Sequence, residues 1–525
     1  GHFRNAAQFD WFYCRADVFK ATQARIQTAE KRKRIAIQAA VRSATHAVVK
    51  QAMHTESFVA ELQTIVGLNY VLISADDKAP FLTDWRKRFT GKAIAVVMPA
   101  STDEVAAIVK CCIAAKVPIV TQGGNTGFCG GATPYPSGHE IVLSLKRMNC
   151  IRSTDIANQT MTVEAGCILQ SIQEVAAEAG HLFPLSLGAE GSCMIGGNLA
   201  TNAGGTNVLR YGNARDLCLG LEVVTAQGEI WHGLKGLRKD NTGYDLRDLF
   251  IGSEGTLGII TAAVLKLYPL PLSQWTTLVA TSNIPSAIAL LGLFQQRAAS
   301  LLTGFEMMTQ ESLDLCASHF PQMTNPLPNN PPYTILIELS DHESEEHVRL
   351  LLEQILETAL EEGLVSDAII ASNLSQAQAF WQMREHITLA QAQEGANLKH
   401  DITLPLSSLD QFMQSTDALM RTAYPGIRII NFGHLGDGNL HYNIAPPKGV
   451  DPHAFNQAEE TAIHGLVYAQ VELCGGSISA EHGVGQLKLD GLRAHRGAVA
   501  HDMMKAIKRA LDPDNILNPN KVVSI

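Results

Sequence analysis

The sequence predicts an α+β protein with more than one domain, and three observations support this prediction. At 525 residues the chain is too long for one ordinary hydrophobic core, so two or three domains are expected. From residue 93 to residue 268, short apolar strands alternate with helices and glycine-rich loops. After Pro269-Leu-Pro271, strands and helices follow in an order that is typical of an α+β domain.

Each element of the first half is predicted from its own local pattern. The apolar run 93–98 is a strand that stops at Pro99. Ser101-Thr-Asp-Glu104 has the spacing of a capping box and opens a helix over 105–115. The further expected elements are strands at 117–120, 141–145 and 161–163, a helix over 169–179, a hairpin of 221–225 with 228–233, and a strand over 259–268.

The second half predicts a further set of strands and helices, interrupted by one polar loop. The Pro- and Asn-rich run 325–332 is that loop or a small insertion. Strands are expected at 276–280, 301–307, 333–339, 397–404 and 427–433, and helices at 285–298, 343–362, 374–393, 452–472 and 501–511.

These boundaries divide the chain into four segments. Residues 1–52 form an N-terminal extension, residues 53–270 a first domain and residues 271–475 a second domain. We expect residues 476–525 to return to the first domain. No internal repeat is evident in the sequence.

Composition excludes several classes of protein. Hydrophobic residues make up 46% and charged residues 18%, and no apolar run reaches the roughly 18 residues that a membrane-spanning helix needs. The net charge is −10, and outside the basic N-terminal segment nothing indicates a nucleic-acid partner. The ten cysteines include no C-x-x-C pair, which favours reduced thiols and a cytosol-like compartment.

The first 52 residues differ from the rest of the chain. They hold ten Lys/Arg and three Asp/Glu, and the first methionine is Met53. We interpret them first as sequence upstream of a natural start, with a packed helical extension or a targeting peptide as alternatives. The predicted location is therefore the cytoplasm or the membrane periphery, or the mitochondrion if the segment is a transit peptide.

A histidine-rich hairpin is the strongest candidate for a metal site. Asp437-Gly438 between two apolar runs predicts a two-residue turn, which would place His434 directly opposite His441. With the carboxylate of Glu481 as a third ligand, the set suits Zn²⁺ first, and also Mn²⁺ or Fe²⁺. The alternative is a tight turn with two structural histidines.

Three glycine-rich stretches, 121–131, 188–205 and 252–258, fall mostly at strand ends. Glycine lets the backbone approach a ligand, and successive free N–H groups bind phosphate oxygens. Neither a Rossmann fingerprint nor a P-loop is present, so a pyrophosphate cofactor held in another way is expected. The alternative is a set of ordinary tight turns.

Taken together, these motifs resemble a known family over roughly residues 60–525. The stretches Gly123-Gly-Asn-Thr-Gly127, Ile195-Gly-Gly-Asn198 and Gly252-Ser-Glu-Gly-Thr-Leu-Gly258 resemble the FAD-binding motifs of the vanillyl-alcohol-oxidase/PCMH flavoprotein superfamily. The second half, including Glu481-His482-Gly-Val-Gly485 and Leu517-Asn-Pro-Asn-Lys521, resembles the FAD-linked oxidase C-terminal domain. This pairing is typical of D-lactate, glycolate and D-2-hydroxyglutarate dehydrogenases.

The resemblance implies a fold and a cofactor. A PCMH-type FAD-binding domain of two α/β subdomains would be followed by a ferredoxin-like α+β domain that binds substrate and metal. The FAD would be non-covalent, because Asn125 and Thr126 stand where covalent members often carry histidine. The implied FAD contacts are Gly123, Gly124, Asn125, Thr126, Gly127, Ser192, Gly196, Asn198, Thr201, Asn202, Gly205, Gly258, Ile260 and Asn518.

A second set of residues resembles the substrate-binding pattern of D-2-hydroxyglutarate dehydrogenases. Trp381, Arg384 and Thr388 share one face of a predicted helix, and Lys399 follows in a Lys-x-Asp sequence. Taken alone, Arg384 is a surface or ion-paired arginine. The resemblance implies instead that Arg384, Thr388 and Lys399 bind the distal carboxylate of a dicarboxylic acid.

The implied reaction is the oxidation of D-2-hydroxyglutarate to 2-oxoglutarate. The cation would chelate the 2-hydroxyl and the C1 carboxylate, with Asn443 as a further contact, and His482 would accept the hydroxyl proton. The C2 hydrogen would pass as hydride to the flavin N5. No ferredoxin-like cysteine cluster exists, so the electrons are expected to leave to a separate acceptor, which is a quinone, an electron-transfer protein or oxygen. This scheme is compatible with a homodimer.

Three alternatives remain open from the sequence. D-Lactate or glycolate oxidation would leave Lys399 without a partner. A non-catalytic flavoprotein subunit would bind FAD without turnover. A metallohydrolase would use the histidines and Glu481 and give the glycine loops no function.

Overall fold

The computed structural model describes residues 28, 33 and 54–525, so the interpretations of residues 1–52 fall outside the described residues apart from two positions. Contacts divide the chain between Thr64 and Ile65. In the first unit, residues 54–64 are helical. The strands among the described residues and the candidate site belong to the second unit, which is described below.

A four-stranded sheet carries the first glycine-rich loop. Its order is β1-β2-β4-β3, with β2 (Val96–Val97), β4 (Ile141–Ser144) and β3 (Ile119–Gln122) parallel and β1 (Val71–Leu72) antiparallel to β2. Helix α3 (Thr102–Ala115) has the predicted cap, because the Ser101 hydroxyl accepts the Glu104 N–H at 3.2 Å, but it begins before the predicted residue 105.

A five-stranded antiparallel sheet carries the other two glycine-rich loops. The order is β5 (Ile151–Asp155), β6 (Thr160–Glu164), β10 (Ile259–Lys266), β8 (Cys218–Val224) and β9 (Ile230–Gly233). The predicted hairpin is confirmed as β8 with β9, in which Val224 pairs with Ile230. The helices of this part are α4 (Leu169–Glu178), α5 (Ile195–Ala200), α6 (Val208–Tyr211) and α7 (Arg247–Phe250).

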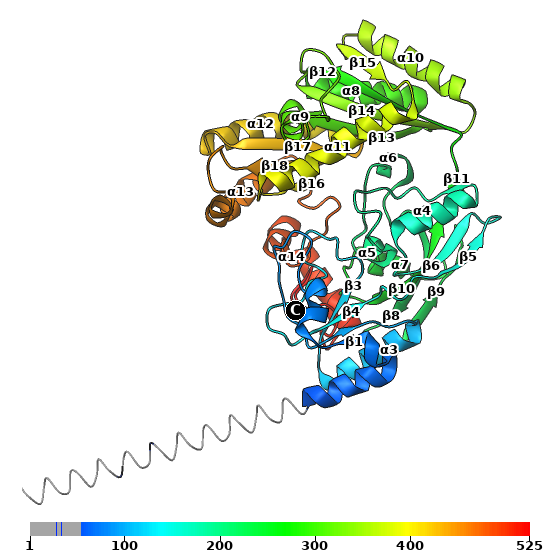
Figure 1. Ribbon diagram of the computed structural model, residues 1–525, viewed down its shortest axis with the longest axis vertical. Coiled ribbons are helices and arrows are strands. Elements are labelled where there is room, and N and C mark those ends of the chain that lie inside the picture. Colours follow the sequence, from blue (N-terminus) through cyan, green and yellow to red (C-terminus); the bar gives the residue numbers. More distant parts are fainter. Residues whose placement is uncertain (1–27, 29–32, 34–53) are drawn as a thin grey trace, which may run out of the picture. The chain divides into compact units, whose positions relative to one another are not determined.

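The second half forms a seven-stranded antiparallel sheet (Figure 1). Its order is β15 (Asp367–Ile370), β12 (Ser273–Thr281), β14 (Tyr333–Asp341), β13 (Leu302–Thr309), β17 (Arg428–His434), β18 (Asn439–Ala445) and β16 (Asp401–Thr403). Because side chains alternate between the two faces of a strand, each face of this sheet builds its own core.

One core lies against α8 (Ile284–Ala298), α10 (Glu345–Glu361), α12 (Leu409–Ala423) and α13 (Pro452–Leu473). The other lies against α9 (Gln310–His319) and α11 (Leu374–Glu394). Phe305 and Met307 of β13 belong to the first core, whereas Met308 belongs to the second. Glu306 between them therefore faces α9 and α11, which is the face that carries the candidate site.

Most predicted helices are confirmed to within two residues at each end, but several elements were missed. No element was predicted for α9, α12 or β15. The predicted helix 501–511 begins earlier, in α14 (Leu489–Leu511), which is interrupted at Gly497 with φ 74°. Among the described residues, no helix is long and apolar enough to cross a membrane.

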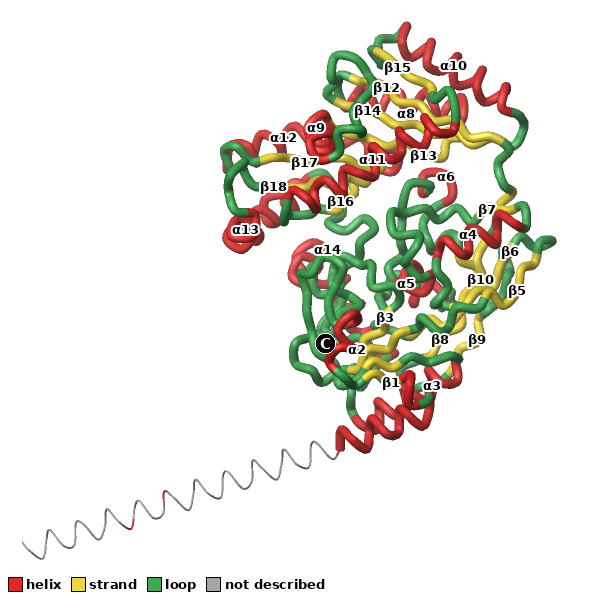
Figure 2. Tube along the Cα trace, viewed as in Figure 1, coloured by secondary structure: helices red, strands yellow, loops and turns green. Residues whose placement is uncertain are grey.

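The C-terminal segment lies against β3. Leu517 forms a parallel bridge with Ile119, and the Asn518 N–H donates to the Ile119 carbonyl at 2.8 Å. Residues 474–488 form a long loop between α13 and α14 (Figure 2). This loop carries Glu481 and His482.

An ion pair joins the loop before β2 to the second half. Arg88 Nη2 lies 2.7 Å from Glu460 Oε1 on α13, and the Glu460 carboxylate also binds His464 Nε2 at 3.0 Å. Burial raises the pKa of Glu460, but His464 and Arg88 outweigh burial and lower the pKa from the usual 4.5 to about 2. The carboxylate therefore favours the folded state only while it is ionised.

Glu460→Gln should remove a pH-dependent part of the stability. A depressed folded pKa contributes stability that is present above about 4.5 and is lost as the pH falls through about 2. The stability difference between wild type and the variant should therefore be largest near neutral pH and shrink below pH 4.5. Unfolding measured against pH tests this, with Glu472→Gln, an exposed residue of the same helix, as the control. A constant difference across that range would contradict the prediction.

Candidate active site

The hairpin of β17 and β18 differs from the predicted turn, and the two-residue loop is wrong. Residues 435–438 form the loop, with a 3₁₀ turn over Leu435–Asp437 and Gly438 at φ 80°. The Asp437 carboxylate accepts the Asn439 N–H at 3.1 Å, which stabilises the longer loop. His434 is therefore paired with Asn439, not with His441.

This shift keeps the two imidazoles together. His441 is paired with Phe432, two residues before His434 on the same face, so the histidines are diagonal neighbours. Their ring centroids are 5.4 Å apart. The sequence thus predicted the proximity correctly and the register incorrectly.

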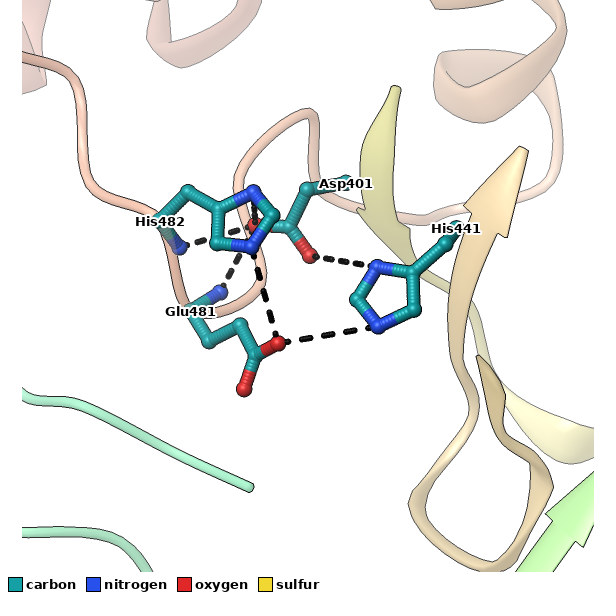
Figure 3. A group of neighbouring side chains, drawn as sticks. All are labelled: Asp401, His441, Glu481 and His482. Atoms are coloured by element: carbon teal, nitrogen blue, oxygen red, sulfur yellow. Dashed lines mark hydrogen bonds and ion pairs between the residues drawn. The ribbon is translucent and has the colours of Figure 1, made fainter. Parts of the chain in front are cut away.

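The imidazoles converge on one carboxylate oxygen. Glu481 Oε1 lies 3.7 Å from the Nε2 atoms of His434, His441 and His482. The rings of His441 and His482 are stacked, with centroids 5.7 Å apart. The proposed ligands and the proposed base therefore form one cluster; Figure 3 shows His441, Glu481 and His482 in it.

Asp401 is a member of the cluster that sequence reasoning missed. It lies on β16 opposite His441, and its Oδ2 accepts the backbone N–H groups of Glu481 and His482 at 2.9 Å each (Figure 3). The ligand atoms of Asp401, His441, Glu481 and His482 all lie within 4.8 Å of one another. The available signal was the Lys-x-Asp sequence, in which only the lysine was given a function.

Glu306 is the second residue that was missed. It is fully buried on β13, and its Oε1 binds His434 Nδ1 at 2.7 Å. Its Oε2 binds Arg384 Nε at 2.9 Å and Nη2 at 2.8 Å. A glutamate within an otherwise apolar strand was the only signal in the sequence. Arg384 is therefore ion-paired in the structure, as its sequence position considered without the family resemblance indicated.

The charges of the cluster influence one another. Burial lowers the pKa of His434, but Glu306 and Glu481 outweigh burial and raise it well above the usual value. Burial alone dominates at His441, whose pKa falls to about 3. Burial raises the pKa of Glu481, and the neighbouring histidines reverse this and hold it below the usual range. Imidazole nitrogens beside carboxylate oxygens are a donor set that fits Zn²⁺, Mn²⁺ or Fe²⁺.

The predicted substrate-binding residues lie on α11, on β18 and just before β16. Arg384 lies over the Phe432 ring, 4.7 Å from its centroid, and Thr388 follows one turn later on α11. Asn443, two residues after His441, donates to Gln391 Oε1 at 3.0 Å. Lys399 precedes β16, and burial with the nearby Arg86 lowers its pKa to about 7. Among the described residues Lys399 has no hydrogen-bond or ion-pair partner.

Two glycines of the glycine-rich loops lie too close to neighbouring segments of the chain to carry side chains. A Cβ on Gly124 would lie 2.1 Å from the Ser192 carbonyl oxygen, and one on Gly196 would lie 2.7 Å from the Ala165 Cβ. Asn125 itself has φ 55°. By contrast, a Cβ on Gly127 or Gly197 would meet nothing within 4 Å, so open space borders the same loops.

Buried polar atoms line this region and fit a polar cofactor such as FAD. Thr121 Oγ1, Asn198 Oδ1 and Asn518 Oδ1 have no hydrogen-bond partner among the described residues. Such atoms are costly unless a ligand or water satisfies them. A Cβ on Gly204 of the second loop would lie 2.8 Å from Glu481 Oε2, so this loop adjoins the histidine cluster. The remaining predicted FAD contacts stay predictions.

The fold and the paired loops define an FAD-dependent oxidoreductase. Residues 93–233 match the family described as FAD binding domain, and residues 270–522 match the family described as FAD linked oxidases, C-terminal domain. The chain belongs to the FAD-linked oxidase family. The predicted fold class is confirmed, and a metallohydrolase is no longer supported.

Several relatives extend over most of the chain. The chain is 37% identical over 465 residues to "D-2-hydroxyglutarate dehydrogenase, mitochondrial" of Arabidopsis thaliana, covering 89% of this chain and 81% of that protein. It is 37% identical over 469 residues to D-2-hydroxyglutarate dehydrogenase of Xanthomonas citri pv. viticola, covering 89% of this chain and 97% of that protein. It is 36% identical over 497 residues to a Schizosaccharomyces pombe protein whose name includes D-lactate dehydrogenase, covering 91% and 92%.

Solved structures share the fold at low sequence identity. p-Cresol methylhydroxylase with substrate bound has a TM-score of 0.73 and 18% identity, covering 90% of this chain and 97% of that chain. Alkyldihydroxyacetonephosphate synthase has a TM-score of 0.67 and 17% identity, covering 89% and 85%. These likenesses concern the architecture and not the reaction.

Glu306→Gln should destabilise the protein by about 3–5 kcal/mol, because it leaves the buried Arg384 guanidinium without a counter-charge. The double variant Glu306→Gln/Arg384→Met should recover part of that loss, since it removes both charges and fills a similar volume. Denaturant unfolding measures both. Glu353→Gln, which breaks the exposed pair with Arg349, is the matched control and should cost less than about 1 kcal/mol. Equal losses of unfolding free energy in Glu306→Gln and Glu353→Gln would contradict the prediction.

Proposed function

We propose that the protein oxidises a D-2-hydroxy acid, with D-2-hydroxyglutarate as the leading substrate and 2-oxoglutarate as its product. The observation that carries this proposal is the convergence of three imidazoles on Glu481 Oε1 beside the second glycine-rich loop. Two relatives that share 37% identity carry the name D-2-hydroxyglutarate dehydrogenase, which supports this choice of substrate.

His434, His441 and Glu481 would hold a divalent cation, with Zn²⁺ as the first choice. When bound, the cation would act as a Lewis acid on the 2-hydroxyl, and FAD would accept the hydrogen and electron pair from C2. Glu306 supports this arrangement, because its bond to His434 Nδ1 leaves Nε2 facing Glu481. Asn443 would bind the C1 carboxylate from the same strand face.

His482 would accept the proton of the hydroxyl. Its Nε2 faces Glu481, and its Nδ1 lies 3.5 Å from Asp401 Oδ2, so the carboxylate orients the ring. The Phe128 ring packs against the imidazole at nearly a right angle, with centroids 4.7 Å apart. The acceptor of the electrons would be a quinone or an electron-transfer protein.

Arg384, Thr388 and Lys399 would bind the distal carboxylate. Lys399 supports this assignment because it is half-buried and has no anionic partner in the described chain. D-Lactate and glycolate have no second carboxylate, so they would leave this ammonium unpaired. D-Lactate oxidation remains the runner-up, since a relative named for that activity is 36% identical.

Anaerobic flavin bleaching tests the function directly. The purified protein is mixed separately with D-2-hydroxyglutarate, D-lactate and glycolate, before and after treatment with a chelator. Bleaching by D-2-hydroxyglutarate that the chelator abolishes is the expected result. Bleaching by D-lactate alone would overturn the substrate, and FAD that no substrate reduces would indicate a non-catalytic subunit.

Lys399→Met should separate the two substrate classes. Loss of one charge-assisted hydrogen bond, worth about 1.5–3 kcal/mol, should lower kcat/KM for D-2-hydroxyglutarate by about 10- to 100-fold. The kcat/KM for D-lactate should not fall, because lactate has no group that reaches Lys399. Lys448→Met, at an exposed position of the same half, is the control. Equal effects on both substrates would contradict the assignment of Lys399.

A further inference from the structure

The loop that carries Glu481 and His482 is held by its backbone. Asp401 Oδ2, from the second half of the chain, accepts the N–H groups of residues 481 and 482 at 2.9 Å each. Charge-assisted bonds of this kind are among the stronger hydrogen bonds in proteins. They fix the middle of the loop 474–488 from the side of the seven-stranded sheet.

A second buried carboxylate holds the same loop from the other side. Glu254, in the third glycine-rich loop, accepts the Val484 N–H through Oε1 at 2.6 Å and the Gly485 N–H through Oε2 at 2.8 Å. A Cβ on Gly483 would lie 2.6 Å from Glu254 Oε1, so the contact requires a glycine there. Both carboxylate oxygens of Glu254 thus accept hydrogen bonds from the loop that carries Glu481.

Glu254 is itself rigidly placed in the FAD-binding half. Its N–H donates to the Ala200 carbonyl at 2.8 Å, and its carbonyl accepts Asn518 Nδ2 at 2.8 Å. It has φ 53°, a backbone conformation that few residues other than glycine adopt. The first glycine-rich loop adds to the attachment, since the Cys129 carbonyl accepts the Gln486 N–H at 3.0 Å.

We infer that Glu254, in the FAD-binding half, is a positioning residue that fixes the places of Glu481 and His482 in the site. This inference rests on the proposed function of those two residues. Glu254 acts through the backbone of residues 484 and 485 and does not touch the imidazole cluster directly. Its carboxylate is suited to the task because both oxygens accept, whereas an amide of the same size would place one N–H₂ group against a backbone donor.

Glu254→Gln tests the inference in the full-length, FAD-loaded protein. Zn²⁺ affinity, measured by calorimetry, should fall by about 10- to 100-fold, as for the removal of other groups that orient metal ligands. Bound FAD and the melting temperature should stay close to those of Glu140→Gln. Glu140 is the matched control, because it is also buried and accepts a backbone N–H, from Tyr135 at 2.6 Å, and this donor does not belong to the loop 474–488.

Hydrogen exchange at residues 482–487 supplies a readout that does not depend on metal or activity. Protection of these amides should fall in Glu254→Gln and remain in Glu140→Gln. Glu254→Asp keeps the charge but shortens the side chain by one CH₂ group. At least one of the Val484 and Gly485 amides should therefore lose protection in this variant. This variant also covers the case in which Glu254→Gln does not fold.

The outcomes separate the inference from the proposed function. Unchanged Zn²⁺ affinity and unchanged amide protection in both Glu254 variants would overturn the inference. Equal losses of Zn²⁺ affinity and of amide protection at residues 482–487 in Glu254→Gln and Glu140→Gln would also overturn it, since a general structural effect of removing a buried carboxylate explains that result. If the wild-type protein binds no Zn²⁺ but amide hydrogen exchange at residues 482–487 still depends on Glu254, the proposed metal site is contradicted and the positioning role of Glu254 is supported.

Discussion

Buried negative charge is the constraint on which the site depends. Glu306, Asp401 and Glu254 are all removed from water, where an ionised carboxylate without partners is strongly disfavoured. Each is compensated in a different way. Glu306 has a guanidinium and an imidazole as partners. Asp401 accepts backbone N–H groups and an amide and lies near His482 and Lys488. Glu254 accepts two backbone N–H groups and lies near Lys488 and Lys521. These bonds fix the imidazoles and the loop before any substrate arrives.

The seven-stranded sheet explains why these groups meet. Glu306, His434 and His441 come from three strands, and alternation along each strand turns all of them toward the face covered by α9 and α11. Arg384 reaches the same face from α11. The opposite face is filled by apolar side chains and provides the rigid support on which the site is built.

Local sequence signals predicted the parts of this protein that local physics determines. The capping box at Ser101, the β8–β9 hairpin and the long amphipathic helices were predictable, because their signals lie within a few residues. The register of the His434–His441 hairpin was not, because it depends on a hydrogen bond at Asp437 and on contact of Gly438 with the distant Leu404. Glu306 and Asp401 escaped notice for a related reason: their partners lie 38 or more residues away along the chain. The joint pattern of glycine motifs identified the family, which no single motif could have done.

The attachment of the Glu481 loop to the FAD-binding half has a thermodynamic meaning. A ligand that stabilises the third glycine-rich loop in its present position also stabilises the backbone to which Glu254 is bonded. If bound FAD strengthens the binding of a cation at Glu481 in this way, the bound cation must strengthen the binding of FAD by the same free energy, because coupling between two sites is reciprocal. Loading of the two cofactors would then be cooperative, and a chain that had lost one of them would also hold the other less tightly.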